Sequence, residues 1–436
     1  MYLTSLNVLI IIKILSLFVL SKLRCAMRLL SLFSGCGGMD IGFEGDFFCL
    51  KKSINFALHY DWIESEYKEW VKLKKTKFET VFANDIRKDA KTAWVSYFEK
   101  KKLKASEIYH NESIIDLVKR AQKGEKVFPE NIDIVTGGFP CQDFSVSGKR
   151  LGFNSIKNHL GSLLTYDEPS LENRGRLYMW MRDVITLTKP SLFVAENVKG
   201  LTNLNDAKEI IENDFSTACN GGYLVVPAKT LFAPYFGVPQ SRERVIFFGF
   251  RKNLLKRKAL KELSNAIISE KYNPYPAPTH GNNLSPIVNC ADAFVGLEEP
   301  DKSIDISQQK YSMAKFMGNH CQGQTEIKLN SVSPTIRSEH HGNIEFRRLS
   351  IEHGGTHIDE LQQGLKERRL TVRECARIQT FPDDYQFILP AKDNYVSVSA
   401  SKAYQIIGNA VPCVLAYNIA KNIENKWHLY FSEKKS

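Results

Sequence analysis

The sequence predicts an α/β fold with a doubly wound, mostly parallel sheet and a second, smaller domain. Between residues 27 and 251, short apolar runs rich in β-branched residues alternate with stretches of helical periodicity, as βαβ units do. Glycine-rich or polar turns follow several of these runs, at the strand ends where open α/β sheets bind ligands. With 436 residues, 43% apolar and 25% charged, the chain can bury the core of about two domains, which excludes a disordered or disulfide-stapled protein.

Six apolar runs are predicted as strands of this sheet, and most of them lead into a turn or a helical pattern. They cover residues 29–33, 80–83, 132–136, 192–195, 224–226 and 245–250. A connecting helix is predicted over residues 174–187, because apolar residues recur there at helical spacing and Lys189-Pro190 ends the pattern. The lysine- and aromatic-rich residues 46–78 are expected to form a solvated helical excursion, to which we assign no role.

The sequence changes character after residue 251, where prolines cluster and helical periodicity becomes scarce. We therefore expect residues 27–251 to form one domain and residues 252–390 a separate, loop-rich domain. Within the second domain, Thr371 and Glu374 have the spacing of a capping box and predict the start of a helix. Residues 391–436 are expected to return to the first domain, with a last helix around residues 410–425.

The first 26 residues carry an apolar run that is long enough to be a candidate membrane span. However, no Lys or Arg precedes the run, no small-residue cleavage site follows it, and Lys13 at its centre costs about 2.5–3.5 kcal/mol on insertion scales. The first predicted strand begins just after Met27. We therefore expect residues 1–26 to be a mis-assigned start or a leader outside the fold, and we expect no membrane association; a genuine anchor is the alternative.

The charge and the cysteines restrict the class of protein further. The formal net charge of +11 favours a polyanionic partner such as nucleic acid. Nine cysteines are scattered without a Cys-x-x-Cys pair, which is typical of a reducing compartment, so a cytoplasmic location is expected and a zinc ribbon is not. Histidines at 320, 340, 341, 353 and 357 could suggest a metal site, but Gly354 and Gly355 disfavour a helix between His353 and His357, so we expect loop histidines and no metal.

Two polar turns at strand ends are candidates for binding a nucleotide-like ligand. The turn FSGCGG at residues 33–38 lets the backbone approach a ligand closely, although a glycine turn is often only a turn. It does not match the dinucleotide motif G-x-G-x-x-G, because Asp40 occupies the third glycine position. Asp85 follows the second strand, where a carboxylate can accept hydrogen bonds from ribose hydroxyls or can cap a helix.

Further turns carry groups that could perform covalent chemistry. GGFPCQ, residues 137–142, follows the third strand and presents Cys141 as a candidate thiolate nucleophile, although most lone cysteines are packing residues. Glu196, at the end of the next strand, could be kept protonated by burial and donate to a ring nitrogen. Arg242 and Arg244 lie two residues apart and should point to the same side of their strand, as either a site or a surface ion-pair ladder.

In order and wording, these motifs resemble the DNA cytosine-5 methyltransferase family of the bacterial restriction-modification type. The resemblance covers nearly all of residues 28–425 and consists of FSGCGG, the acid after strand two, GGFPCQ, ENV, QSRER, LTVRECARIQTFP and GNAVP. It implies a fold of the S-adenosylmethionine-dependent, Rossmann-like type, with residues 252–390 as a target-recognition domain. It also implies S-adenosyl-L-methionine as cofactor and double-stranded DNA as substrate.

The resemblance assigns roles residue by residue. Cys141 would add to carbon 6 of a flipped cytosine, Glu196 would bind the base at nitrogen 3, and Arg244, supported by Arg242, would fix the base and stabilise charge. A basic loop after Cys141 and the second domain would bind DNA. The implied cofactor residues are Phe33, Gly35, Cys36, Gly37, Gly38, Asp85, Glu112, Ile114, Phe139, Pro140, Leu177, Asn409 and Val411. The implied DNA contacts are Gln142, Ser145, Ser147, Lys149, Arg150 and Gln240.

Two alternatives remain at this stage. The tRNA-directed branch of the same family shares the cysteine and the ENV motif, but its Cys-Phe-Thr is absent here, since Lys199-Gly-Leu-Thr-Asn follows ENV. The second alternative is a DNA-binding protein without catalytic activity. In such a protein the Pro-Cys-Gln or the Glu-Asn-Val motif should be broken, but both are intact here. We expect a monomer, and a cognate restriction endonuclease that is linked in function but not bound.

Overall fold

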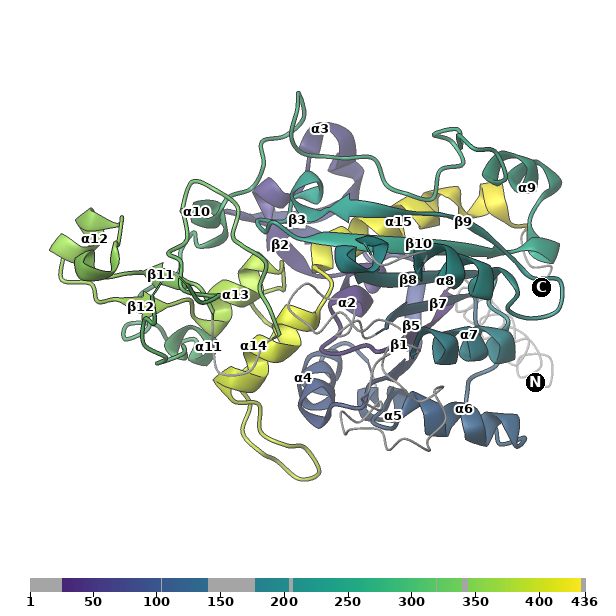
Figure 1. The fold of residues 1–436 in the computed structure, drawn as a ribbon, viewed down its shortest axis with the longest axis horizontal. Coiled ribbons are helices and arrows are strands. Elements are labelled where there is room, and N and C mark those ends of the chain that lie inside the picture. The colour runs from purple at the N-terminus through teal and green to yellow at the C-terminus, as the bar shows by residue number, and fades with distance from the viewer. Residues whose placement is uncertain are drawn as a thin grey trace, which may run out of the picture.

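The structure is a computed structural model that describes residues 26–102, 104–139, 177–203, 207–318, 320–338 and 344–432. Figure 1 shows a larger half built around a sheet and a smaller half of short elements and loops. The sheet has seven strands in the order β6-β5-β1-β7-β8-β10-β9. These strands are β1 (Met27–Leu32), β5 (Phe78–Asn84), β6 (Tyr109–His110), β7 (Ile134–Gly138), β8 (Leu192–Val198), β9 (Tyr223–Phe232) and β10 (Glu243–Arg251).

The predicted α/β fold with a mostly parallel sheet is confirmed. The sheet is parallel from β6 through β5, β1 and β7 to β8. The strand β10 pairs antiparallel with both of its neighbours, β8 and β9. Side chains alternate between two apolar clusters, as β8 illustrates: Leu192 and Val194 belong to one cluster and Phe193 and Ala195 to the other. The sheet is therefore buried on both faces.

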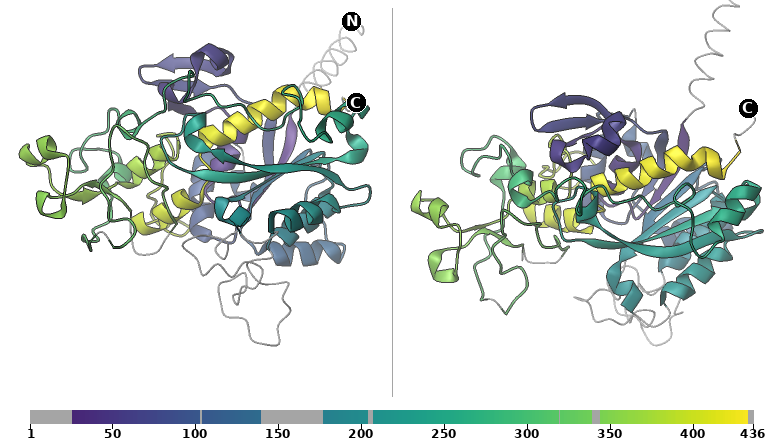
Figure 2. Two further views of the ribbon diagram at one scale, coloured as in Figure 1. Left: turned by 45° about the horizontal axis from the view of Figure 1, so that its top comes forward. Right: turned by 90° about the horizontal axis from the view of Figure 1, so that it is seen from above.

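Helices cover both faces of the sheet (Figure 2). Helices α2 (Gly38–Glu44), α4 (Lys88–Phe98) and α15 (Cys413–Tyr430) contribute to one cluster. Helices α6 (Ile114–Gln122), α7 (Leu177–Thr188) and α8 (Ala207–Ser216) contribute to the other. α7 agrees with the helix predicted over residues 174–187, of which 174–176 lie outside the described residues. None of the described helices is long and apolar enough to cross a membrane.

Residues 48–73 form a small sheet, so the helical excursion predicted for residues 46–78 was wrong. β2 (Phe48–Leu50), β4 (Trp70–Leu73) and β3 (Ile63–Tyr67) pair antiparallel in that order, with the short helix α3 (Phe56–His59) between β2 and β3. The physical reason is tertiary. Cys49, Val71 and Leu73 are at most 3% exposed and join the core, which overrides the polar composition of the segment.

The smaller half contains short elements joined by loops. Its helices are α10 (Cys290–Ala293), α11 (Ile306–Gln309), α12 (Ile358–Gln362) and α13 (Val372–Ile378), and β11 (Phe346–Arg348) pairs with β12 (Arg368–Arg369). α9 (Arg257–Leu263), although it follows residue 252, lies with the larger half (Figure 1). The predicted capping box of Thr371 and Glu374 is confirmed at the start of α13. The boundary at residue 252 stays a prediction, and α9 itself packs against α15.

The chain then returns to the sheet through two helices. α14 (Ala400–Asn409) ends at Asn409, and the last helix, α15, begins at Cys413 and runs to Tyr430. The predicted start near residue 410 was therefore about three residues early. α15 packs along α2, because Gly42 leaves no side chain between the helices: a Cβ atom there would lie 2.4 Å from the Cβ atom of Ala416.

Candidate active site

A buried acid and a buried arginine face each other at the carboxyl end of β8. Glu196 lies opposite Gly138 of β7 on one side and Ile246 of β10 on the other. The Nε atom of Arg244, two residues earlier in β10, lies 2.6 Å from Oε1 of Glu196, and both side chains are about nine-tenths buried. A Cβ atom at residue 138 would lie 2.8 Å from Oε2 of Glu196, so glycine there leaves room for the carboxyl group.

The surroundings of Glu196 determine its protonation. Burial raises the pKa of Glu196 above its ordinary value, and the charges of Arg244 and Arg242 oppose that shift without cancelling it. A carboxyl group with a raised pKa is more readily available as a hydrogen-bond donor near neutral pH. The arrangement can therefore hold a proton against a ring nitrogen while keeping a cation beside it.

The strand that precedes the candidate nucleophile ends at this same edge. Phe139 follows β7, is 3% exposed, and its carbonyl accepts a hydrogen bond of 3.3 Å from the Nδ2 atom of Asn197. The next residues in the sequence lie outside the described residues, and with them several predicted positions. These are Pro140, Cys141, Gln142, Ser145, Ser147, Lys149 and Arg150.

Arg242 and Gln240 have positions that the sequence did not predict. Arg242 is 1% exposed and its guanidinium donates to the carbonyls of Ile336 (3.2 Å), Gly408 (2.8 Å) and Ala410 (2.9 Å). Gln240 is fully buried, and its side chain binds the backbone N–H of Ile336 and the amide of Gln379. The amide of Gln240 thus joins parts of the protein to each other in this structure, and its contact with DNA stays a prediction.

The glycine turn of residues 33–38 lies at the carboxyl end of β1. Phe33 and Gly35 adopt φ angles of 52° and 54°, in the left-handed region that favours glycine. The carboxylate of Asp85 accepts the N–H of Gly35 at 3.0 Å and that of Arg87 at 2.9 Å. Burial raises the pKa of Asp85, and these backbone hydrogen bonds oppose the shift. Asp85 thus holds the turn, in addition to any contact it makes with a ligand.

The second half of the turn packs inside the protein. A Cβ atom at Gly38 would lie 2.3 Å from the carbonyl oxygen of Val411, so glycine is required where the turn meets the segment before α15. The thiol of Cys36 is buried, donates to the carbonyl of Ile406 at 3.2 Å, and has a pKa raised by burial. Cys36 can therefore contribute backbone to a ligand site, whereas its thiol points into the core.

The other predicted cofactor residues differ in their accessibility. Ile114, Leu177 and Val411 are each 5% exposed, at the beginning of α6, at the first described residue of α7 and just before α15. Asn409 is exposed at the end of α14. The carboxylate of Glu112 is partly exposed and lies 2.6 Å from a guanidinium nitrogen of Arg120. A ligand contact by Glu112 must therefore share this carboxylate with Arg120.

Sequence reasoning missed the residues that hold the turn from outside. The hydroxyl of Tyr109 donates to the carbonyl of Gly35 at 2.9 Å, and that of Tyr385 donates to the carbonyl of Cys36 at 2.7 Å. Asp40 is fully buried and accepts hydrogen bonds from Ser31 (2.6 Å) and Trp94 (2.7 Å). The sequence singled out Asp40 only because it occupies the third glycine position of the dinucleotide motif. It gave no signal for the tyrosines, because their partners are 74 and 349 residues away.

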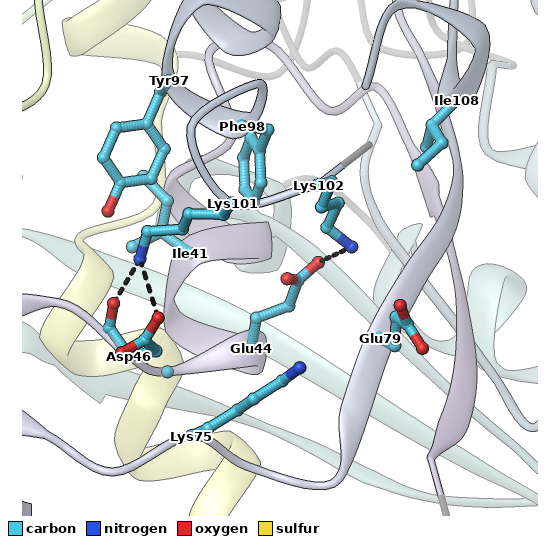
Figure 3. Close-up of a pocket in the computed structure, with 11 residues that line it drawn as sticks. Ile41, Glu44, Asp46, Lys75, Glu79, Tyr97, Phe98, Lys101, Lys102 and Ile108 are labelled. Atoms are coloured by element: carbon cyan, nitrogen blue, oxygen red, sulfur yellow. Dashed lines mark hydrogen bonds and ion pairs between the residues drawn. The ribbon is translucent and has the colours of Figure 1, made fainter. Parts of the chain in front are cut away.

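A cavity of about 410 Å³ lies elsewhere, near the start of β5 and the ends of α2 and α4. In Figure 3 its charged side chains point toward one another: Lys102 pairs with Glu44 at 2.8 Å and Lys101 with Asp46 at 3.6 Å. It lies at the edge of the sheet opposite Glu196 and contains none of the predicted site residues. In the described part of the chain, no group of three or more His, Cys, Asp or Glu side chains could hold a metal ion.

The sheet and the residues at its carboxyl edge define an α/β methyltransferase fold. Two solved structures share it: the methyltransferase Dnmt2 of S. pombe has a TM-score of 0.53 at 18% identity, covering 92% of this chain and 99% of that one. The methyltransferase EhMeth of Entamoeba histolytica has a TM-score of 0.52 at 13% identity, covering 92% and 99%. At these identities the likeness concerns the fold alone.

The sequence relatives define the family. The chain matches the C-5 cytosine-specific DNA methylase family over residues 70–425, and it belongs to that family. It is 31% identical to the type II methyltransferase M.BsuRI of Bacillus subtilis over 93% of this chain and 81% of the relative. It is 28% identical to M.NgoPII of Neisseria gonorrhoeae over 91% and 95%. The protein is a DNA cytosine-5 methyltransferase.

Proposed function

We propose that this enzyme flips a cytosine out of a specific duplex site, attacks its C6 atom with the thiolate of Cys141, and transfers a methyl group from S-adenosylmethionine to C5. The observation that carries the proposal is the buried pair of Glu196 and Arg244, 2.6 Å apart, at the edge to which β7 leads. Cys141 follows Phe139 by two residues, which span at most about 7 Å. This short connection from Phe139, whose carbonyl is bound by Asn197, supports the proposed role of Cys141.

The glycine turn fits a nucleoside-bearing cofactor. A Cβ atom at Gly35 would meet no other atom within 4 Å, so there is open space beside this backbone. Asp85 has lone pairs left after accepting two backbone N–H groups and can accept ribose hydroxyls. Phe33, Phe139 and Leu177 supply apolar surface near the strand ends. S-adenosylmethionine, when bound, supplies a methyl group on a positively charged sulfur.

Three residues of the chain have separate roles in the reaction at the base. The Cys141 thiolate forms a bond to C6, and the ring electrons shift so that C5 becomes nucleophilic. Glu196, whose pKa is raised by burial, donates its proton to ring nitrogen 3, and Arg244 stabilises the negative charge that develops on the base. C5 takes up the methyl group and then gives its proton to water. Nitrogen 3 returns its proton to the Glu196 carboxylate, and the bond between C6 and Cys141 breaks with its electron pair on sulfur, which restores both the aromatic ring and the thiolate.

DNA binding is assigned to the basic loop after Cys141 and to residues 252–390. Flipping the base costs a few kcal/mol, which contacts to the backbone and to neighbouring bases must supply. Because relatives such as M.BsuRI are type II methyltransferases, we extend the proposal to restriction-modification, in which methylation protects DNA from a cognate endonuclease. We further propose that the enzyme acts as a monomer in the cytoplasm.

A methyl-transfer assay tests the proposal against both alternatives. Purified protein is incubated with labelled S-adenosylmethionine and either unmethylated duplex DNA or tRNA. We expect label on C5 of cytosine in DNA, none on tRNA, and none on either substrate with Cys141→Ala. Transfer to tRNA alone would favour the tRNA-directed alternative, and binding of DNA without any transfer would favour a silent DNA-binding protein. Full activity of Cys141→Ala would refute the mechanism.

The recognition site is measured separately. Bisulfite sequencing of DNA from cells that express the protein reports every methylated cytosine with its neighbours. We expect one short sequence to be methylated throughout. Methylation scattered without a common sequence would contradict a role in restriction-modification.

A further inference from the structure

The small sheet of residues 48–73, named here the inserted sheet, lies between the two halves of the molecule. Figures 1 and 2 show it beside α10 and above the larger sheet. Most of it precedes residue 70, where the match to the methylase family begins. The active site described above uses none of its side chains.

One face of the inserted sheet is fixed to the catalytic half. Cys49, Val71 and Leu73 are buried in the main apolar cluster. Trp62, just before β3, packs edge-on against Tyr417 of α15, with ring centroids 5.4 Å apart. The main apolar cluster extends into the smaller half as well, so the contact of Trp62 with Tyr417 is what ties this face to the catalytic half.

The same sheet also contacts the segment that leads into the smaller half. The carbonyl of Lys52 lies 2.9 Å from the Nε2 atom of His280, and Asn55 donates from Nδ2 to the carbonyl of Thr279 at 2.8 Å. Gly237, in the turn between β9 and β10 of the catalytic half, lies beside both: a Cβ atom there would be 2.1 Å from the carbonyl oxygen of Ser53 and 2.9 Å from the His280 ring. These contacts fix the point from which the smaller half extends.

The opposite face of the inserted sheet carries side chains that contact the smaller half itself. Leu50 packs with Val288 and Ala293 in a separate apolar cluster. The guanidinium of Arg377, in α13, lies over the ring of Trp70 at 4.7 Å from its centroid. The same guanidinium donates to the carbonyls at the end of α10, those of Ala293 (3.2 Å) and Val295 (2.7 Å).

A charge pair completes this interface. The Nζ atom of Lys52 lies 2.6 Å from a carboxylate oxygen of Asp292. Asp292 also forms the capping box of α10 with Asn289, so its position is fixed by the helix. The neighbouring Lys51 makes a pair of similar length, 2.5 Å, but its partner Glu66 belongs to the inserted sheet. Of these two adjacent lysines, only Lys52 connects the sheet to the smaller half.

We infer that the inserted sheet is a brace between the two halves, in which Lys52 and Trp70 are positioning residues that fix the angle of the DNA-reading half relative to the catalytic edge. This inference rests on the proposed function, in which residues 252–390 read DNA. Because neither side chain touches the cofactor turn or Glu196, the brace acts on DNA affinity and leaves the affinity for S-adenosylmethionine unchanged.

The two adjacent lysines provide a matched test. Lys52→Asp places a carboxylate against Asp292, whereas Lys51→Asp places one against Glu66, and both variants change the net charge equally. We expect the KM for DNA to rise about threefold or more in Lys52→Asp relative to Lys51→Asp, with the KM for S-adenosylmethionine equal in both. Lys52→Arg, which keeps the pair, should behave as the wild type does.

A second pair of variants tests the apolar contact. Trp70 and Tyr67 face each other across β4 and β3, but Tyr67 is 63% exposed and has no partner in the smaller half among the described residues. Trp70→Ala should raise the KM for DNA and accelerate amide hydrogen exchange in residues 288–295, while Tyr67→Ala should do neither. Trp70→Phe, which retains a ring under Arg377, should lie between them.

The outcomes separate this inference from the proposed function. If the wild type methylates DNA and the two lysine variants share one KM for DNA, the brace is refuted and the proposed function stands. If the wild type methylates no DNA, the proposed function fails, and hydrogen exchange still tests the brace. Equal exchange of residues 288–295 in Lys52→Asp and Lys51→Asp would then refute it.

Discussion

At the scale of single residues, Glu196 carries the most specific prediction. Glu196→Gln keeps the size and shape of the side chain but removes its ability to give up a proton, so we expect kcat to fall by about 10²–10⁴ while DNA binding is retained. Single-turnover methylation and DNA binding, measured on the same preparation, check this.

The neighbouring Glu243 supplies the control for that experiment. It belongs to the same strand as Arg244, but it pairs at the surface with Lys199 at 2.9 Å. Glu243→Gln should therefore leave kcat close to that of the wild type. Equal activity of the wild type and Glu196→Gln would show that this carboxyl group is not the proton donor.

Asp40 makes stability depend on pH. Burial raises the pKa of Asp40 from 3.8 to about 6, although Ser31 and Trp94 both donate to it. Folding therefore favours the protonated form, and this contribution is complete below the unfolded pKa and is lost as the pH rises through about 6. The loss amounts to about 3 kcal/mol, at 1.36 kcal/mol for each unit of pKa.

Asp40→Asn should lack this step. We expect the difference in free energy of unfolding between wild type and variant to change by about 2 kcal/mol between pH 4 and pH 7, measured with urea at both values, because part of the contribution is already lost at pH 4. Asp116→Asn, on the exposed face of α6, serves as control. A difference that is the same at both pH values would contradict the assignment.

At the scale of elements, the crossing of α2 and α15 depends on Gly42. In an isolated helix, alanine would be about 1 kcal/mol more favourable than glycine. Here the added Cβ atom would lie 2.5 Å from the carbonyl oxygen of Cys413, so Gly42→Ala should instead destabilise the protein by about 1–3 kcal/mol.

A paired substitution identifies the contact responsible. Ala416→Gly removes the methyl group that the new Cβ atom would meet at 2.4 Å. Combined with Gly42→Ala, it should restore part of the lost stability in urea unfolding, whereas independent sites would give additive losses. Strictly additive losses would show that the helices do not meet at this point.

The elements also show where sequence reasoning succeeded. Six of the seven strands of the main sheet and the start of α13 follow from apolar runs and from the capping box of Thr371 and Glu374, which are local signals, whereas the two-residue strand β6 was not predicted. The inserted sheet could not be predicted in this way. Its strands are three to five residues long, and only the burial of residues such as Val71 against distant helices makes them strands.

At the candidate site, the sequence could not predict which polar side chains are buried. Arg242 and Gln240 are polar residue types that are usually found on a surface or in a ligand site. In the structure they are buried, and their partners are backbone carbonyls and amides 94 to 168 residues away. Glu196 and Arg244 could be placed from sequence because each ends or begins a predicted strand of one sheet. The sequence contains no comparable signal for contacts between distant loops.

At the scale of the whole molecule, the two halves should respond to acid in opposite ways. In the smaller half, Arg368 and Arg348 outweigh the effect of burial and lower the pKa of Glu299, and Arg347 and Arg348 do the same for Glu360. Stabilisation by these carboxylates is present above their unfolded pKa, near 4.5, and is lost as the pH falls below it. In the catalytic half, burial raises the pKa values of Asp85 and Glu196, so acid relieves a cost there.

Hydrogen exchange followed by mass spectrometry measures this contrast. After correction for the intrinsic rate, protection in residues 344–374 should decrease between pH 6 and pH 4, while protection in β1, β7 and β8 is maintained. Glu299→Gln, which weakens the pairs with Arg348 and Arg368, should make the smaller half less protected already at pH 6. A uniform loss of protection over both halves would contradict the prediction.

The packing of α15 on α2 also sets the order of events during synthesis. The two helices are neighbours in space, but α2 begins at Gly38 and α15 at Cys413, near opposite ends of the chain. At about 5–20 residues per second, on the order of 20–75 s pass between the synthesis of one helix and that of the other. During this interval Gly38 lacks the backbone of Val411 against which it packs. The glycine turn therefore reaches its packed form only when synthesis of the chain is nearly finished.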